Sequence, residues 1–226
     1  LKIKLINLCI GLVTISALLI GSYTNLYTED RPQHVNIYFY EDLDAGNSYV
    51  QLSSQESLIE PLVSYINEEK AKALVPFSGE YLSENWTQSA SSEWQGPSLE
   101  KQIELGENKL VKLKLNSNRS ASRIVLLLPK DSGLTSFYLG SVKMKPVLSS
   151  WGLYEGYYVI YLNGIYNKEV ELKLNFDANK SEVSAYLMDI STKLPPHLDE
   201  LYKDRSGIFS PVHRGDQAIL IKKISI

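Results

Sequence analysis

Residues 168–176 read KEVELKLNF, and the alternation in this stretch decides the fold class of the chain. Apolar side chains occupy every second position, and charged or amide side chains stand between them. Successive side chains of a β-strand point to opposite faces, so the pattern predicts a strand with one buried and one solvated face. The apolar face consists of Val170, Leu172, Leu174 and Phe176.

Three neighbouring stretches extend this pattern into layered sheets. Residues 108–117, NKLVKLKLNS, alternate in the same way, whereas residues 123–129, RIVLLLP, and 156–164, GYYVIYLNG, are apolar on both faces and are expected to be central strands. A strand that is apolar on both faces needs a second layer, so the sheets must be stacked. Turn signals such as KDSG, LNG and DANKS separate the runs. The chain is therefore predicted to be mainly β, an antiparallel β-sandwich with one short helix.

The first part of this domain is predicted to contain a hairpin, that helix and a long loop. Residues 35–40 and 48–52 alternate as strands around the turn-forming sequence EDLDAGN. Residues 57–72 carry apolar side chains at helical spacing, and Ser57 with Glu60 matches a capping box, although Pro61 shifts the start toward Glu60. Residues 77–97 are polar and serine-rich, which predicts a loop.

The composition is that of an ordinary globular chain. Of its 226 residues, 44% are apolar and 22% are charged, and the net charge is −3 with Lys and Arg spread among Asp and Glu. The sequence contains no cluster of basic residues that would bind a polyanion, so nucleic acid is not expected as a partner. The 15 tyrosines favour half-buried β surfaces.

The N-terminus differs from the rest of the chain. Residues 5–23, LINLCIGLVTISALLIGSY, carry no charge and as a helix would span a bilayer core of about 30 Å. Lys2 and Lys4 precede the segment, so residues 1–27 are predicted to be a transmembrane helix in contact with lipid, with residues 28–226 on the extracytoplasmic side. A cleaved signal peptide is the alternative. The chain opens without Met, which predicts the tail of a longer protein.

Covalent features are few in this sequence. The one cysteine, Cys9, lies in the apolar segment, so no disulfide is predicted in the outer domain. Asn85, Asn118 and Asn179 stand in glycosylation acceptor patterns that a secretory pathway would recognise.

A catalytic site is not expected in the polar cluster near the C-terminus. Ser210, His213 and Asp216 lie too close together in one turn to serve as nucleophile, base and orienting acid, and no elbow motif accompanies them. Pro211 and Gly215 instead predict a bend, with Asp216 accepting backbone hydrogen bonds within the turn. Residues 217–226, QAILIKKISI, are predicted to form the final strand.

Metal and cofactor sites are also not expected in this chain. The other histidines, His34 and His197, do not complete the spacing of a zinc ligand set with His213. The sequence therefore predicts no catalytic, metal-binding or cofactor-binding residues in this chain.

Four stretches, in the same order, resemble the C-terminal region of membrane-anchored zinc aminopeptidases of the vacuolar membrane protease and endoplasmic reticulum metallopeptidase type. They are RPQHVNIYFYEDLDAG after the apolar helix, KLKLNSNRSASRIVLLL with its paired strands around a Ser-x-Arg turn, YLMDISTKLP, and the last strand after an acidic residue. The resemblance covers nearly all of residues 20–226. Lys193 stands where the family tends to have Gly, and residues 213–215 stand where small residues and Ser are commoner.

This resemblance implies a non-catalytic role for the chain. In that family the peptidase domain, with its zinc ions and their His, Asp and Glu ligands, precedes several membrane helices and would lie upstream of Leu1. The chain would then be the last transmembrane helix plus a β domain that caps the extracytoplasmic face. Its partners would be the membrane lipid and the upstream peptidase and transmembrane portion of the parent protein.

A binding module of the cell envelope is the alternative function. Trp86, Trp94 and Trp151 with neighbouring tyrosines would then form a platform for a glycan or a protein ligand, exposed together on one surface. The competing interpretation is that the aromatic side chains Phe77, Tyr81, Trp86 and Trp94 pin the loop of residues 77–97 to the core.

Overall fold

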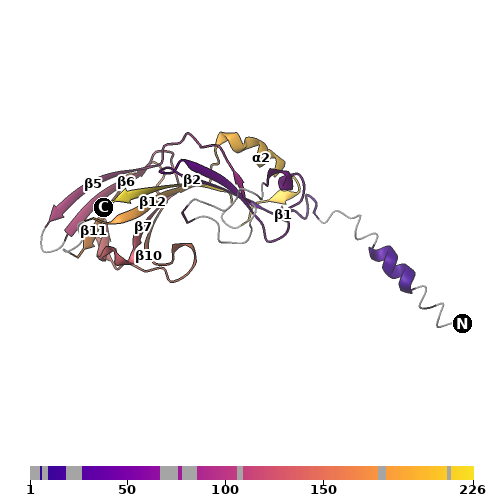
Figure 1. Cartoon of the computed structure of the whole chain (residues 1–226), viewed down its shortest axis with the longest axis horizontal. Coiled ribbons are helices and arrows are strands. Elements are labelled where there is room, and N and C mark those ends of the chain that lie inside the picture. Colours follow the sequence, from indigo (N-terminus) through magenta and orange to yellow (C-terminus); the bar gives the residue numbers. More distant parts are fainter. Residues whose placement is uncertain are drawn as a thin grey trace.

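The computed structural model describes residues 6, 10–18, 27–66, 76–77, 86–105, 109–177, 182–212 and 215–226. The chain is mainly β, as predicted, and its strands form mostly antiparallel sheets in a β-sandwich-like arrangement. Figure 1 shows an elongated β domain with β5, β6 and β11 at one end and α2 and β1 near the other.

The larger sheet has seven strands in the order β10-β7-β12-β14-β2-β3-β4. Their bounds are β2 (Asn36–Asp42), β3 (Asn47–Ser53), β4 (Trp86–Gln88), β7 (Arg123–Pro129), β10 (Tyr157–Asn163), β12 (Ser184–Ser191) and β14 (Gln217–Ser225). β14 is the predicted final strand, and it pairs antiparallel with β12 and parallel with β2. The predicted hairpin is β2 with β3.

The smaller sheet has five strands in the order β5-β6-β11-β8-β9, all paired antiparallel. Their bounds are β5 (Pro97–Leu105), β6 (Lys109–Ser117), β8 (Leu134–Leu139), β9 (Val142–Met144) and β11 (Val170–Phe176). β11 is the alternating stretch KEVELKLNF, and its apolar face is turned to the larger sheet, with Leu172, Leu174 and Phe176 fully buried.

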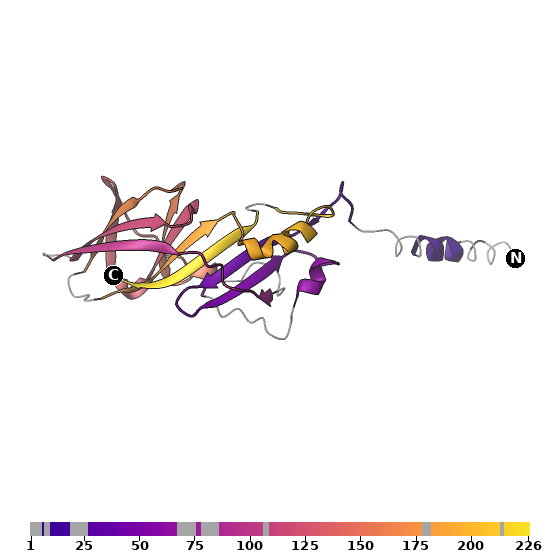
Figure 2. The same cartoon turned by 90° about the horizontal axis from the view of Figure 1, so that it is seen from above.

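Short elements complete the described part of the domain. β1 (Gln33–His34) pairs parallel with β13 (Phe209–Ser210). The 3₁₀ turns are η1 (Leu62–Tyr65), η3 (Lys130–Ser132), η4 (Gly152–Tyr154) and η5 (Pro196–Leu198), and the last leads into helix α2 (Asp199–Asp204). Figure 2 shows β14 in yellow running lengthwise through the domain from the side of α2.

The inner face of the larger sheet carries two separate cores. Over β7, β10 and β12 it packs against the smaller sheet, with Leu126, Leu187 and Leu113 among the fully buried side chains. Over β2, β3 and β14 the same face packs against η1 and α2, and Phe39 is fully buried there. Each Å² of apolar surface that is removed from water contributes about 25 cal/mol to the stability of the fold, so these two cores are its main source of stability.

The outer face of the larger sheet carries a third apolar cluster. It is formed by alternate residues of the same strands, so Val125 and Met188 face outward while their neighbours face the inner core. Tyrosines gather at this cluster, including Tyr40 and Tyr49, which are paired across β2 and β3. RIVLLLP was predicted to be a central strand that is apolar on both faces. β7 confirms this prediction, because it lies between β10 and β12 and its alternate residues belong to the inner and the outer cluster.

Four predictions of detail were wrong. Residues 57–60 precede η1 without forming a helix, and Leu62–Tyr65 is a 3₁₀ turn; residues 67–72 of the predicted helix lie outside the described residues. The predicted loop of residues 77–97 contains β4. β10 was expected to be central but is an edge strand, whose edge is partly covered where Leu148 bridges to Tyr158. β6 and β7 belong to different sheets, so the chain crosses between layers at the Ser-x-Arg turn.

Residues 10–18 are helical, and their apolar side chains are exposed, from 56% for Ile15 to 69% for Val13. Among the helices that the structure describes, none is long and apolar enough to cross a membrane.

Candidate functional site

The C-terminal polar cluster is part of the fold. Asp216 is buried, accepts the backbone N–H of Ile37 at the start of β2 at 2.8 Å, and forms an ion pair with Arg205 after α2. Burial raises the pKa of the Asp216 carboxyl, while the Ile37 N–H and the Arg205 guanidinium act in the opposite direction. Asp216 therefore ties β14, β2 and the α2 segment together.

Of the other predicted members of that cluster, only Ser210 lies in the described residues. The Ser210 hydroxyl donates to the neighbouring Pro211 carbonyl, and His213 lies outside the described residues. His197 packs its ring edge-on against Phe39 and lies 2.8 Å from the Ser89 hydroxyl. Within the ranges described above, no group of His, Cys, Asp and Glu side chains is arranged to hold a metal ion.

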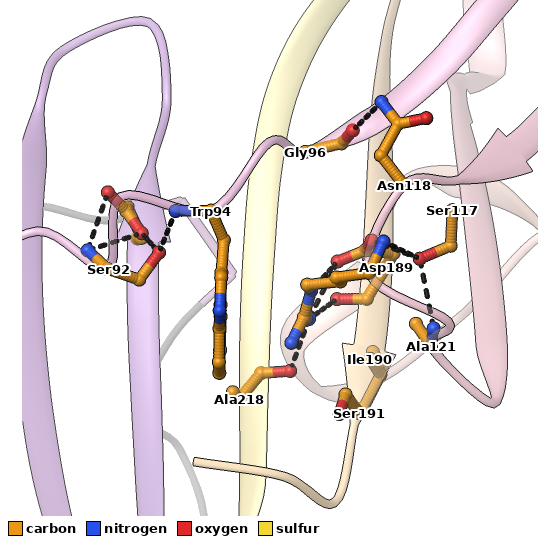
Figure 3. A network of polar contacts seen from close by, with 12 residues as sticks. Ser92, Trp94, Gly96, Ser117, Asn118, Ala121, Asp189, Ile190, Ser191 and Ala218 are labelled. Carbon is orange, nitrogen blue, oxygen red and sulfur yellow. Dashed lines mark hydrogen bonds and ion pairs between the residues drawn. The ribbon is translucent and has the colours of Figure 1, made fainter. Parts of the chain in front are cut away.

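A second buried polar group lies where the two inner cores meet, at the turn between β6 and β7. Arg119 forms an ion pair with Asp189 of β12, with 2.7 Å between Nη2 and Oδ1, and Nε donates to the same oxygen at 2.8 Å. Nη2 also donates to the backbone carbonyls of Asp189 at 3.0 Å and of Ala218 in β14 at 2.7 Å. One guanidinium therefore joins two adjacent strands to the crossover turn (Figure 3).

Neighbouring groups hold this ion pair in place. The hydroxyl of Ser117 donates to the second carboxylate oxygen of Asp189 at 2.8 Å and accepts the N–H of Ala121 at 3.0 Å, which shapes the turn. The ring of Trp94 lies against the Arg119 guanidinium, 5.0 Å from its central carbon. Both carboxylate oxygens of Asp189 are therefore hydrogen-bonded, and the indole covers one side of the guanidinium.

These contacts join the four stretches that carry the family resemblance. Arg119 and Ser117 come from KLKLNSNRSASRIVLLL, Asp189 comes from YLMDISTKLP, and Ala218 comes from the last strand. Ile37, the donor to Asp216, lies in RPQHVNIYFYEDLDAG. The polar residues of these stretches therefore meet in space, and they are used to fasten strands to one another.

A cleft of about 720 Å³ lies on the outer face of the larger sheet. Strand register explains its floor, because paired residues of adjacent strands point to the same side. One row crosses the sheet from Arg123 on β7 through Ile190 and Ile219 to Tyr40 on β2. The next row places Gln217 beside Tyr38 and Tyr38 beside Gln51.

The walls of the cleft come from two chain segments. Residues 147–154 form one wall, and there Val147 and Trp151 are 73% and 74% exposed. Phe77 also lines the cleft and contacts a tyrosine cluster, with ring centroids 5.8 Å from Tyr154, 5.1 Å from Tyr157 and 5.0 Å from Tyr186. Burial in this cluster raises the pKa of Tyr157. The result is an accessible hollow lined by aromatic and aliphatic side chains.

Arg123 is the one charged side chain among the described residues that line the cleft. Its Nε donates to the side-chain oxygen of Asn163 at 2.7 Å. Glu41 and Asp189 of the neighbouring strands face the inner side: Glu41 accepts hydrogen bonds from Ser92 and Asp189 pairs with Arg119. Asp42, at the end of β2, accepts the backbone N–H groups of Asp44 and Ala45 and is not among the described lining residues. The floor of the cleft is therefore mainly apolar, with the amides of Gln51 and Gln217 in one row and a single positive group, Arg123.

The predicted tryptophan platform is wrong in its membership. Trp94 packs on the inner face beside the core that contains Ala218, whereas Trp151 lines the outer cleft beside Ile219. Alternate residues of β14 point to opposite faces, so the two indoles lie on opposite sides of the larger sheet. Trp94 pins the loop to the core, as the competing interpretation expected. The Trp86 side chain and Tyr81 lie outside the described part of the chain.

Of the residues that line the outer cleft, the sequence pointed to Trp151 and Phe77 but not to those of the floor. Tyr38 and Tyr40 belong to the predicted hairpin, where their spacing already placed them on one face. This spacing was the signal that the sequence offered. It did not show that β2 pairs with β14, which brings Tyr38 beside Gln217 and Tyr40 beside Ile219.

Of the three glycosylation patterns, one falls in the described residues. Asn118 is exposed, and its amide donates to the Gly96 carbonyl at 2.9 Å. Asn85 and Asn179 lie outside the described ranges.

Comparison with known proteins yields a distant likeness among solved structures. No family model matches the chain, and no curated protein matches it. Among solved structures, the chain is similar to the Fcho1 Mu homology domain of Danio rerio with bound Eps15 peptide, at 9% identity and a TM-score of 0.31. The match covers 84% of this chain and 92% of that chain. A likeness at this TM-score carries no argument about function.

Proposed function

We propose that this chain is a non-catalytic β domain that works by contact, as a structural cap on the extracytoplasmic face of a membrane-bound zinc aminopeptidase-like protein. One observation carries the proposal: buried polar side chains of three resembling stretches, Arg119, Asp189 and Asp216, are used in contacts that fasten chain segments together. Arg119 bonds to β12 and β14, and Asp216 bonds to Arg205 and to the backbone N–H of Ile37 in the remaining stretch. Buried, paired charges of this kind maintain a fold and are poorly placed to react with a substrate.

Membrane attachment through residues 5–23 belongs to the same proposal. It is supported by the uncharged apolar sequence and by the exposed apolar side chains of residues 10–18, for example Leu12 and Leu18. Exposed apolar side chains in such a segment are stabilised by contact with lipid. The zinc ligands of the parent enzyme would lie upstream of Leu1.

The reading frame upstream of Leu1 provides the direct test. The expected result is several apolar spans preceded by a domain with a zinc ligand set of His, Asp and Glu. A stop codon followed by a start codon at residue 1 would contradict the cap proposal.

A biochemical test uses the chain itself. Residues 1–226 purified in detergent are expected to contain no stoichiometric zinc and to hydrolyse no amino-acid p-nitroanilide. Stoichiometric zinc, measured by elemental analysis after dialysis against zinc and then buffer, would overturn the assignment of a non-catalytic domain.

A ligand-binding module of the cell envelope is the second candidate, and the outer cleft favours it. Accessible hollows lined by apolar and aromatic side chains with few polar groups are typical ligand sites. Binding that depends on Trp151 but not on Trp94 would assign the site to the cleft. An isolated start codon at residue 1 together with such binding would favour this candidate over the cap.

A further inference from the structure

We propose that the outer cleft binds an extended peptide segment that presents an apolar or aromatic side chain next to a carboxylate. The inference rests on the proposed contact function and names the chemistry of the partner. It follows from three features of the described residues: the apolar floor, the exposed wall and the position of Arg123.

The floor and wall provide the apolar part of the site. Met188, Ile190 and Ile219 line the cleft, and the wall adds Leu148 and Trp151, which are 42% and 74% exposed. Exposed apolar side chains that gather at one hollow mark interaction surfaces, and an indole at such a rim is the residue type that most often dominates binding. A partner side chain that enters the cleft would bury this surface.

Arg123 gives the site its charge preference. Arg123 lines the cleft at the end of the row that contains Ile190. Within the described residues, its Nε donates a hydrogen bond to the side-chain oxygen of Asn163. The planar guanidinium group of an arginine can donate two parallel hydrogen bonds to the two oxygens of one carboxylate. Because the neighbouring carboxylates of Glu41 and Asp189 face the inner side, no acidic group competes with the ligand for this arginine among the described lining residues.

The lining favours a peptide over a glycan. Aliphatic side chains, among them Val159, Met188 and Ile219, make up much of the floor. A sugar presents hydroxyl groups around its ring, and those that lie over the aliphatic part of the floor, away from Gln51 and Gln217, would be buried without partners at a cost in free energy. A peptide can place an apolar side chain on this floor and a carboxylate on Arg123 at the same time.

The experiment is to pan a random-sequence peptide library displayed on phage against residues 1–226 in detergent. Enriched peptides would be synthesised with a fluorophore, and their dissociation constants measured by fluorescence anisotropy. The expected consensus contains an aromatic or large aliphatic residue with Asp or Glu close to it. Replacement of that acidic residue by Lys in the synthetic peptide is expected to abolish binding.

Variants of the chain locate the site. Trp151→Ala is expected to weaken binding about thirtyfold, and Arg123→Gln about tenfold, with part of the loss restored in Arg123→Lys. Two matched controls lie outside the cleft lining: Tyr166→Ala removes another exposed aromatic ring, and Lys143→Gln removes another exposed cation. Both controls are expected to bind as the unmodified chain does.

Each outcome decides a separate point. A consensus without an acidic residue, or binding that is unchanged in Arg123→Gln, overturns the inference. Binding to an arrayed glycan through Trp151 with no peptide enriched also overturns it, while supporting the binding-module candidate. Failure to enrich any peptide overturns the inference. The cap proposal is tested separately by the upstream reading frame, so the inference and the cap proposal can fail independently.

Discussion

Arg119 and Asp189 form an ion pair whose side chains are only 6% and 0% exposed, at the junction between the two inner cores. The pair lies between layers: Arg119 comes from the turn that carries the chain out of the smaller sheet, and Asp189 comes from the middle of the larger sheet. Because Nη2 of Arg119 also reaches the Ala218 carbonyl, the pair holds β12 and β14 against that turn (Figure 3).

Arg119→Ala is expected to lower the free energy of unfolding by about 3–5 kcal/mol, because it leaves the carboxylate of Asp189 buried without its partner. Urea unfolding followed by circular dichroism measures this. The matched control is Lys112→Ala, which breaks the exposed pair with Glu104 and is expected to cost less than about 1 kcal/mol. Equal losses in the two variants would contradict a structural role for the buried pair.

Asp216→Ala is expected to destabilise the domain by about 3 kcal/mol, because Arg205 would remain buried without its carboxylate and Ile37 N–H would lose its acceptor. The same unfolding assay measures the loss. Asp177→Ala removes an exposed carboxylate and is expected to change stability by less than about 0.5 kcal/mol. Full stability in Asp216→Ala would return the C-terminal cluster to consideration as a reactive site.

Much of the fold could be predicted because strand patterning records burial directly. KEVELKLNF became β11 with its apolar face on the core, and RIVLLLP became β7, buried on both faces. The errors have physical causes. Residues 57–60 have helical spacing, but Leu58 and Ile59 pack against the second inner core without a regular helix. GYYVIYLNG was expected to be central because it is apolar on both faces, but the outer face of β10 lies against the tyrosine cluster at an edge.

The outer cleft could not be predicted, because its residues meet only through strand pairing across long separations. Tyr38 and Gln217 become neighbours through the parallel pairing of β2 with β14, which no local pattern specifies. Local signals did predict the turn after Pro211 and the final strand. The partners of Asp216 were beyond reach for the same reason as the cleft: Ile37 is separated from it by 179 residues.

Tyr65 is expected to make the stability of the domain sensitive to alkaline pH. Its hydroxyl donates to the Asp204 carboxylate at 2.6 Å, and this hydrogen bond, with burial, raises the pKa of Tyr65 from 10.0 to about 12. A folded-state pKa above the unfolded value means that the contribution is fully present below pH 10.0 and is lost as the pH rises through about 12.

The comparison of the unmodified chain with Tyr65→Phe measures this contribution. The unmodified chain is expected to have the higher melting temperature below pH 10.0, and the difference is expected to shrink between pH 10.0 and about 12. Tyr166→Phe removes the hydroxyl of an exposed ring and, as the matched control, is expected to leave the melting temperature below pH 10.0 unchanged. A difference between the unmodified chain and Tyr65→Phe that stays constant across this range would contradict the contact with Asp204.

Trp94 and Trp151 are expected to separate stability from surface accessibility, because they lie on opposite faces of the larger sheet. Trp94→Ala removes an indole from the inner core and from the Arg119 guanidinium, and is expected to cost about 2 kcal/mol. Trp151→Ala, at a side chain that is 74% exposed, is expected to cost less than about 0.5 kcal/mol and to lower the fluorescence that acrylamide quenches readily. If the two variants lost equal stability, Trp151 would belong to the core and the outer cleft could not be an open binding surface.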